Sequence, residues 1–259
     1  LPPIASPPPV DPERVRQQRL ATVEELWRNL NEIYPALEYK GITNRSWIEP
    51  TLEKVPQART EGEFYDLLLE LVASLKDTHT RILSYPRQPW RETPSVFLNE
   101  VEGKVAVIKA DPSTGLTTGD VLVAIGGQPV EKCLATALKQ VCGSTERARV
   151  RGACDRLLRG APGSTVAVTV ESPQKGRREI TLRCERKDGF MAEPNLSSRP
   201  LDTSVGYVRI AGWGGSDLVA DFDRALESFK DCKGLIIDVR GNGGGLDQLA
   251  DEVNGRLTD

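Results

Sequence analysis

The chain has 259 residues, of which 27% are charged, and its formal net charge is −3. This composition is that of an ordinary globular protein with enough chain for one large domain or two to three small ones. The near-neutral charge and the lack of a basic block argue against nucleic acid as a partner, and no apolar run approaches the ~20 residues that span a bilayer.

The cysteines and the single histidine bear on metal and redox chemistry. Five cysteines occur without CxxC or Cys/His spacing, and His79 is the one histidine of the chain. We therefore expect no metal and no other cofactor. The odd number leaves at least one cysteine unpaired, and a disulfide between Cys142 and Cys154 stays open as an alternative.

Residues 1–10 are rich in proline and begin without methionine. Such a segment resembles a tether that remains after processing or cloning. It favours an exported protein, periplasmic or extracellular.

Capping signals and apolar periodicity predict a helical cap domain over residues 11–92. Asp11 followed by Pro12 supplies the cap and the first-turn proline of a first helix. Thr60 and Glu63 form a capping box for another helix, and a short helix is expected between the two.

Alternating apolar residues and turn signals predict a β-rich domain over residues 93–187. The expected strands are 95–99, 104–110, 121–125, 165–171 and 178–184, and the helix candidates are 131–141 and 147–159.

Residues 188–259 predict the beginning of an α/β domain. After a polar connection to about Pro200, a strand, a helix, a second strand and a second helix are expected at 205–210, 217–229, 235–239 and from 246. This order implies parallel strands joined by a crossover helix. The fold class is therefore α+β and multidomain, and we expect the remainder of the last domain to lie outside this chain, since two strands leave sheet surface uncovered.

The most informative stretch follows the second of these strands and reads Asp238-Val-Arg-Gly-Asn-Gly-Gly-Gly245. It lacks the last glycine or alanine of a dinucleotide fingerprint, where Leu246 stands, and it lacks the Gly-Lys-Ser/Thr of a P-loop. Its glycines permit positive φ and free N–H groups at a helix start, which suit an oxyanion or a phosphate. A tight turn without chemistry is the equal alternative.

Three segments together resemble one known family. Residues 115–130, with Gly-Leu-x-x-Gly-Asp and Ile-x-Gly-x-x-Val, resemble the permuted PDZ domain of bacterial processing proteases. Residues 233–245 resemble the start of the catalytic core of S41 serine peptidases, the carboxyl-terminal processing and tricorn-core type. Residues 67–80, ending in Asp-Thr-His-Thr, resemble the helical cap of that family.

The resemblance implies a serine peptidase that cleaves polypeptides near their C-termini through an acyl-enzyme. It places the nucleophilic serine beyond Asp259, so this chain is expected to be truncated and inactive. Gly244 matches the oxyanion donor, with Gly243 and Gly245 as alternatives. His79 matches the histidine base of tricorn-like members, but a His-Thr pair also occurs here in lysine-type members, so a lysine further along remains the other candidate.

The resemblance also implies a site for the C-terminus of a polypeptide. Ser95, Val96, Phe97 and Leu98 occupy the place of the carboxylate loop and the strand to which a peptide adds, although the expected glycine is missing. The polypeptide substrate is the expected partner, and homo-oligomerisation stays open. The arginine-rich residues 142–159 are interpreted as a solvated helical face rather than an attractor of acidic peptides.

Two functions from other classes stay open at this point. One is a non-catalytic PDZ-type peptide-binding or scaffold protein, and the other is a phosphate-binding α/β protein.

Overall fold

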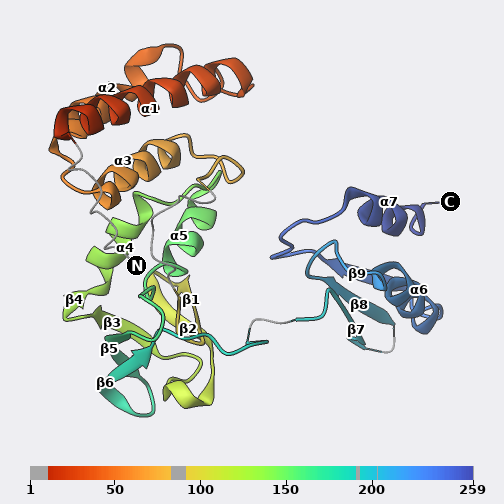
Figure 1. The fold of residues 1–259 in the computed structure, drawn as a ribbon. Coiled ribbons are helices and arrows are strands. Elements are labelled where there is room, and N and C mark those ends of the chain that lie inside the picture. Colours follow the sequence, from red (N-terminus) through yellow and green to blue (C-terminus); the bar gives the residue numbers. More distant parts are fainter. Residues whose placement is uncertain (1–10, 83–91, 191–192, 203, 259) are drawn as a thin grey trace, which may run out of the picture. The chain divides into compact units, whose positions relative to one another are not determined.

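A computed structural model describes residues 11–82, 92–190, 193–202 and 204–258. It divides the chain into two compact units, unit 1 (Leu1–Asp188) and unit 2 (Gly189–Asp259), each of which contains helices and a β-sheet (Figure 1). The mixed α and β content confirms the expected fold class at that level. The finer division into cap, PDZ-like domain and core start stays a prediction.

The helical part of unit 1 begins and ends where its caps predict. The Asp11 side chain accepts the N–H of Glu13 at 3.0 Å, and Thr60 and Glu63 form both bonds of the capping box. Val23, Ile48, Phe64, Leu68 and Leu71 form its buried core. The elements are α1 (Pro12–Ile33), a 3-10 turn (Arg45–Ile48), α2 (Glu49–Lys54), a second 3-10 turn (Val55–Gln57) and α3 (Glu61–Ser74).

The strands of unit 1 form one antiparallel sheet in the order β1-β2-β3-β5-β6, with β4 paired to β3. The helices α4 and α5 both pack against it: α4 contacts β3 and β4, and α5 contacts β1, beside which Figure 1 shows it. The elements are β1 (Val96–Val101), β2 (Lys104–Ala110), β3 (Val121–Ile125), β4 (Gln128–Pro129), α4 (Val130–Leu138), α5 (Glu146–Cys154), β5 (Thr165–Ser172) and β6 (Gly176–Arg183), with a 3-10 turn at Pro112–Thr114.

Unit 2 contains the expected parallel pair. The strands β8 (Val205–Ile210) and β9 (Gly234–Asp238) run parallel and are joined by α6 (Leu218–Ser228). The helix α7 (Asp247–Gly255) follows β9. The predicted strand-helix-strand-helix order is therefore confirmed.

One strand of unit 2 was wrongly predicted as a connection. Residues Leu196–Pro200 form β7, which pairs antiparallel with the free edge of β8. Its sequence, Leu-Ser-Ser-Arg-Pro, carries one large apolar residue and a proline, so it lacks the alternation that marks a half-buried strand. Pairing with β8, and not its own pattern, makes it a strand.

Helices cover one face of the unit 2 sheet. Val208 and Ile210 pack with Phe222 of α6 and Val253 of α7 in one core. The residues that alternate with these point to the opposite face, where Ile236 is 47% exposed. Tyr207 and Asp238 also lie on that face.

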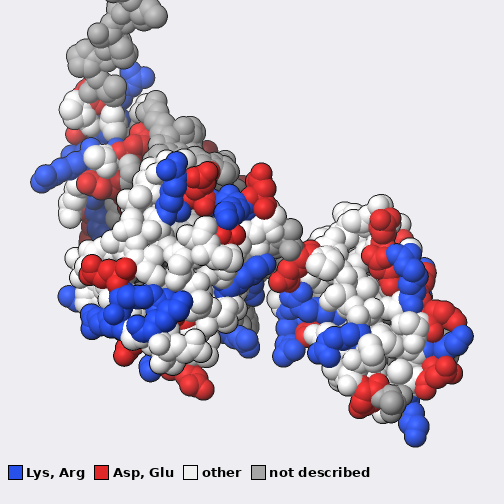
Figure 2. Space-filling view, turned by 90° about the horizontal axis from the view of Figure 1, so that it is seen from below, with Lys and Arg blue, Asp and Glu red and all other residues white. Residues whose placement is uncertain are grey.

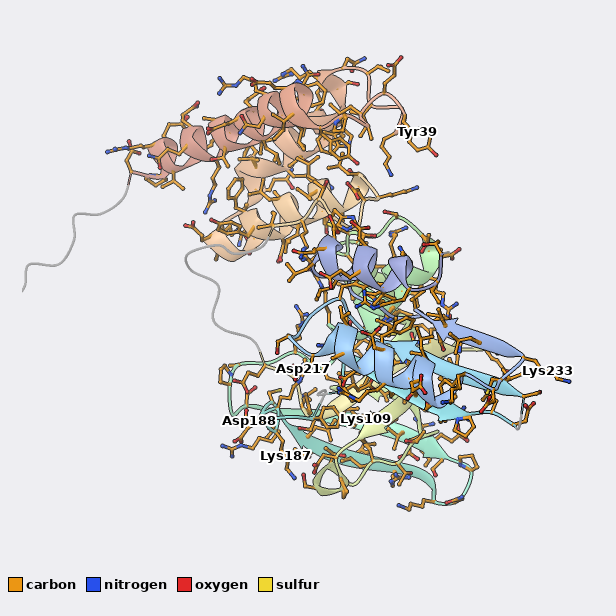
Figure 3. The ribbon with its side chains drawn as sticks, turned by 90° about the vertical axis from the view of Figure 1, so that its right-hand side faces the viewer. Tyr39, Lys109, Lys187, Asp188, Asp217 and Lys233 are labelled. Atoms are coloured by element: carbon orange, nitrogen blue, oxygen red, sulfur yellow. The ribbon has the colours of Figure 1, made fainter. Side chains whose placement is uncertain are left out.

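Acidic and basic side chains are interspersed over the face of each unit that Figure 2 shows. Tyr39, 88% exposed, projects from the loop after α1 (Figure 3). Among the described residues, no helix is both long and apolar enough to cross a membrane. The thiols of all five cysteines are free, so Cys142 and Cys154 do not form the disulfide that the sequence left open.

Candidate active site

The glycine turn lies where β9 ends and before α7 begins. Gly241, Gly244 and Gly245 have φ of 77°, 94° and 147°. Side chains rarely adopt such values, which explains why glycine occupies these positions. The predicted strand, tight turn and helix start are therefore all present.

A backbone clamp holds this turn against the loop that follows β8. The N–H of Trp213 donates to the carbonyl of Gly244 at 2.9 Å, and the N–H of Leu246 donates to the carbonyl of Trp213 at 2.8 Å. A Cβ on Gly245 would lie 1.9 Å from the Trp213 carbonyl oxygen. The two loops thus approach so closely that only glycine fits at this position.

The N–H groups of the three candidate glycines differ in what they bind. The Gly244 N–H donates to Oδ1 of Asn242 at 2.8 Å, and Nδ2 of Asn242 donates to the carbonyl of Ile210 at 3.2 Å. Within the described part of the chain, no acceptor is found for the N–H of Gly243 or Gly245. Gly244 was the first choice as an oxyanion donor, but in this structure the alternatives, Gly243 and Gly245, carry the N–H groups that remain available.

Asp238 anchors the start of the turn. Its carboxylate accepts the Tyr207 hydroxyl at 2.6 Å, the Arg240 N–H at 2.9 Å, and Nε and Nη2 of Arg240 at 2.9 and 2.7 Å. The bonds from Arg240 and then Tyr207 hold the pKa of Asp238 well below its usual range. The same contact raises the pKa of the Tyr207 hydroxyl. A charged Asp238 therefore fixes the direction in which the chain leaves β9.

His79 lies in the loop after α3, and its surroundings fix the backbone rather than the ring. The Asp77 carboxylate accepts Tyr34 Oη at 2.9 Å, Thr80 Oγ1 at 2.7 Å and the backbone N–H of His79 at 3.1 Å. The Thr80 bond, followed by the His79 N–H, lowers the pKa of Asp77. The sequence suggested that these neighbours could orient the imidazole, but the ring is exposed and the side chains around it bind one another and the backbone.

A second contact ties the His79 loop to the segment before α5. The N–H of Thr78 donates to Oγ of Ser144 at 3.1 Å, and the N–H of Ser144 donates to Oγ1 of Thr78 at 2.9 Å. This reciprocal pair joins residues 66 positions apart in the sequence. No local pattern could have revealed it.

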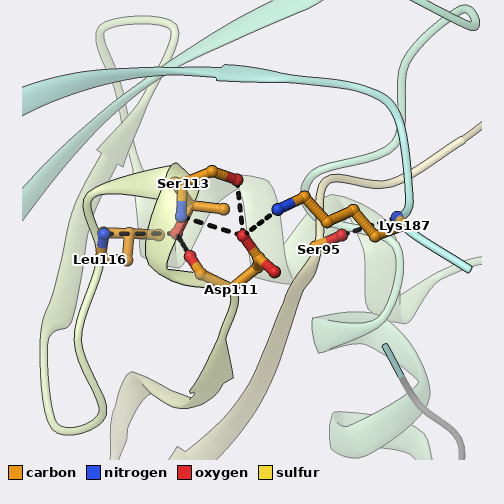
Figure 4. Close-up of polar contacts among 6 residues, drawn as sticks. Ser95, Asp111, Ser113, Leu116 and Lys187 are labelled. Carbon is orange, nitrogen blue, oxygen red and sulfur yellow. Dashed lines mark hydrogen bonds and ion pairs between the residues drawn. The ribbon is translucent and has the colours of Figure 1, made fainter. Parts of the chain in front are cut away.

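The four residues predicted to bind a peptide C-terminus lie at the start of β1. Ser95, Val96 and Leu98 are buried, with exposed fractions of 3%, 6% and 3%. Oγ of Ser95 accepts the backbone N–H of Lys187 at 2.8 Å, as Figure 4 shows. The ring of Phe97 lies 5.8 Å from the Arg151 guanidinium carbon. In this structure the Ser95 hydroxyl is thus occupied by the chain itself.

The candidate residues are divided between the two units. His79 and Ser95–Leu98 lie in unit 1, and the glycine turn lies in unit 2. No cluster of three or more histidine, cysteine or acidic side chains that could hold a metal occurs among the described residues. The sequence reasoning missed Tyr207, Trp213 and Asn242, which shape the turn.

Comparison with known proteins points to one family. Residues 204–259, which contain the glycine turn, match the profile of peptidase family S41. A chloroplastic C-terminal processing peptidase of Tetradesmus obliquus is 28% identical over 241 residues, which are 86% of this chain and 50% of that protein. A carboxyl-terminal-processing protease of Picosynechococcus is 25% identical over 88% of this chain and 55% of that protein.

A putative tricorn protease homologue of Streptomyces coelicolor is 26% identical over 85% of this chain and 22% of its own length. The chain thus spans about half the length of the processing proteases it matches. Among solved structures, mature CPAF has a TM-score of 0.65 at 16% identity, covering 90% of this chain and 56% of that one. Mature CPAF complexed with lactacystin gives a TM-score of 0.66 at 17% identity, over 91% of this chain and 58% of that one. At these identities the likeness concerns the fold alone.

Proposed function

We propose that this chain forms part of a serine peptidase of the S41 type that cleaves polypeptides through an acyl-enzyme. The matched relatives are processing peptidases, and this supports the reaction class. Cleavage near polypeptide C-termini and an exported location are parts of the same proposal.

One observation carries the proposal: the glycine turn stands within the matched residues 204–259, and just before a helix start it presents N–H groups for which the described residues offer no acceptor. Acyl transfer needs fixed donors aimed where the carbonyl oxygen becomes negative. The Trp213 clamp and the Asp238 anchor hold this turn in place before any substrate arrives. Gly243 and Gly245 are the donors this geometry favours, and Gly244 joins them if Asn242 releases its N–H.

We assign the nucleophile to a serine outside residues 1–259. The hydroxyls of Ser204 and Ser216 donate to Asp202 and Asp217 in their own loops, and that of Ser228 donates to the Ala225 carbonyl in its own helix. A nucleophilic serine instead needs a base within hydrogen-bond reach and an exposed strand-to-helix turn. These serines fit structural roles.

We assign the base to His79. It is the one histidine of the chain, and the Asp77 and Thr78 contacts hold its backbone while leaving the imidazole open. The competing assignment is a lysine on a later part of the core. The antiparallel sheet of unit 1 serves as a PDZ-like module that binds the polypeptide.

The test uses a protein in which this chain continues into a completed core. It should hydrolyse an unfolded polypeptide, a fluorophosphonate should stop the reaction, and a metal chelator should not. His79→Ala should lower kcat by roughly 10²- to 10⁴-fold, as expected for loss of a general base. Glu38→Ala, at an exposed position in the loop after α1, is the control and should leave kcat unchanged.

Full activity of His79→Ala would assign the base to a lysine. Peptide binding without any hydrolysis would contradict the peptidase function and support the alternative, a non-catalytic peptide-binding protein.

A further inference from the structure

The strand β1 is an edge strand whose outer side can be identified from its hairpin. Among the strands that the structure describes, β1 pairs only with β2, and the hairpin closes through Glu102 and Gly103, with φ of 52° and 79°. A two-residue turn with both φ positive makes Val101 and Lys104 a hydrogen-bonded pair. Because such pairs alternate along an antiparallel ladder, the N–H and C=O of Glu100 and Leu98 point away from β2.

This outer side is where an extended peptide would add as a further strand. It is instead faced by α5. Cys154 of α5 is 2% exposed and packs in the same buried core as Leu98 of β1, and the Glu100 backbone acts on its thiol by lowering the pKa. Burial raises the pKa of that thiol to about 11, so it is neutral at ordinary pH and donates no charge to the edge.

The contact extends along the strand. The Arg151 guanidinium of α5 covers the Phe97 ring, while Cys154 and Leu158 share one buried core with Leu98. The helix therefore touches β1 from Phe97 to Glu100, which is most of the length that an added strand would need.

Both ends of α5 are tied down. Before the helix, Ser144 exchanges hydrogen bonds with Thr78 beside His79. After it, Gly160 and Glu92 exchange two backbone bonds, each of 2.9 Å. Within the helix, a Cβ on Gly152 would lie 2.7 Å from Cγ1 of Val141, in the segment between α4 and α5, so the packed position of α5 against that segment leaves no room for a side chain at Gly152.

We propose that α5 is an internal cover that closes the outer edge of β1, so that an extended polypeptide adds to β1 only after α5 has moved aside. Moving α5 breaks or strains the Ser144–Thr78 contact, which links occupation of this edge to the position of the His79 loop. The nature of the ligand, a polypeptide, rests on the proposed function. The existence of the cover does not.

Hydrogen exchange of the whole chain tests the cover without any ligand. The Leu98 and Glu100 amides should be protected although β1 is an edge strand. Gly152→Leu should undock α5 and speed their exchange by about tenfold or more, while Gly255→Leu, at a helical glycine with open space around it, should leave them unchanged. Arg151→Ala is the variant to use if Gly152→Leu fails to fold. It removes one contact of α5 without a clash and should speed the exchange of both amides by a smaller factor. Fast exchange of both amides in the unaltered chain, or no change in a folded Gly152→Leu, would overturn the cover.

Binding of a fluorescein-labelled decapeptide with a free, apolar C-terminus tests the consequence. The apparent affinity for the peptide is the intrinsic affinity multiplied by the fraction of molecules in which the site is open. Gly152→Leu should therefore bind the peptide at least about tenfold more tightly than the unaltered chain. Equal affinity, or no binding to a variant whose Leu98 and Glu100 amides exchange freely, would refute β1 as a gated peptide site. Neither result depends on hydrolysis, so the peptidase proposal is judged separately.

Discussion

Lys187, the next-to-last residue of unit 1, forms an ion pair with Asp111. Nζ of Lys187 lies 2.6 Å from Oδ1 of Asp111, which also accepts the N–H and hydroxyl of Ser113, as Figure 4 shows. The bond from Lys187, then those from Ser113, lower the pKa of Asp111 to about 2. Together with the bond that the Lys187 N–H donates to Oγ of Ser95, this ion pair fixes the position of Lys187 next to the start of β1.

The low pKa of Asp111 predicts a pH-dependent contribution to the stability of unit 1. Because the folded pKa lies below the ordinary value, the stabilisation is complete above about pH 5 and is lost as the pH falls from about 4 towards 2. Asp111→Asn keeps an acceptor for Ser113 but loses the charge. Urea unfolding should show it less stable than the unaltered chain at about pH 6, and the difference should narrow at about pH 3. A difference that does not change over this range would contradict the assigned ion pair.

At the scale of elements, the glycine turn depends on a contact between two loops rather than on its own sequence. Trp213 and Gly245 form an isolated parallel bridge beyond the ends of β8 and β9. The bridge extends the pairing of these parallel strands into the candidate site.

Gly245→Ala should break this bridge, because its Cβ would overlap the Trp213 carbonyl and its φ of 147° is strained for alanine. We expect the free energy of unfolding of unit 2 to fall by about 1–3 kcal/mol. Urea unfolding monitored by the fluorescence of Trp213 measures this loss. Gly243→Ala, with open space around it, is the matched control and should change stability by less than about 0.5 kcal/mol. Similar losses of stability in both variants would show that the contact between Trp213 and Gly245 is not the cause of the loss in Gly245→Ala.

Local chemistry predicted most elements, and long-range contacts account for what it missed. The caps at Asp11 and Thr60 act within three residues, so the sequence locates α1 and α3. The strand β7 needs the edge of β8, and the Thr78–Ser144 contact needs two distant segments. The glycine turn was predicted, but which of its N–H groups stays available depends on Asn242.

At the scale of the whole molecule, the chain consists of two units with separate cores. The buried clusters of residues 1–188 and 189–259 share no member, and the chain crosses between them once. Such an arrangement is typical of domains that fold independently.

We therefore expect residues 1–188 to fold on their own. Their thermal unfolding should be cooperative when it is followed by tryptophan fluorescence, to which Trp27, Trp47 and Trp90 contribute, and its midpoint should lie within a few degrees of that of unit 1 in the whole chain. An aggregated or non-cooperative polypeptide would show instead that unit 1 requires unit 2.

The central claim is that residues 1–259 provide part of a serine peptidase site without its nucleophile. Intact-mass measurement after treatment with a fluorophosphonate tests it most directly. The polypeptide of these residues should gain no adduct, whereas a protein with the completed core should gain one adduct, on a serine outside them. An adduct on any serine within residues 1–259 would contradict the account.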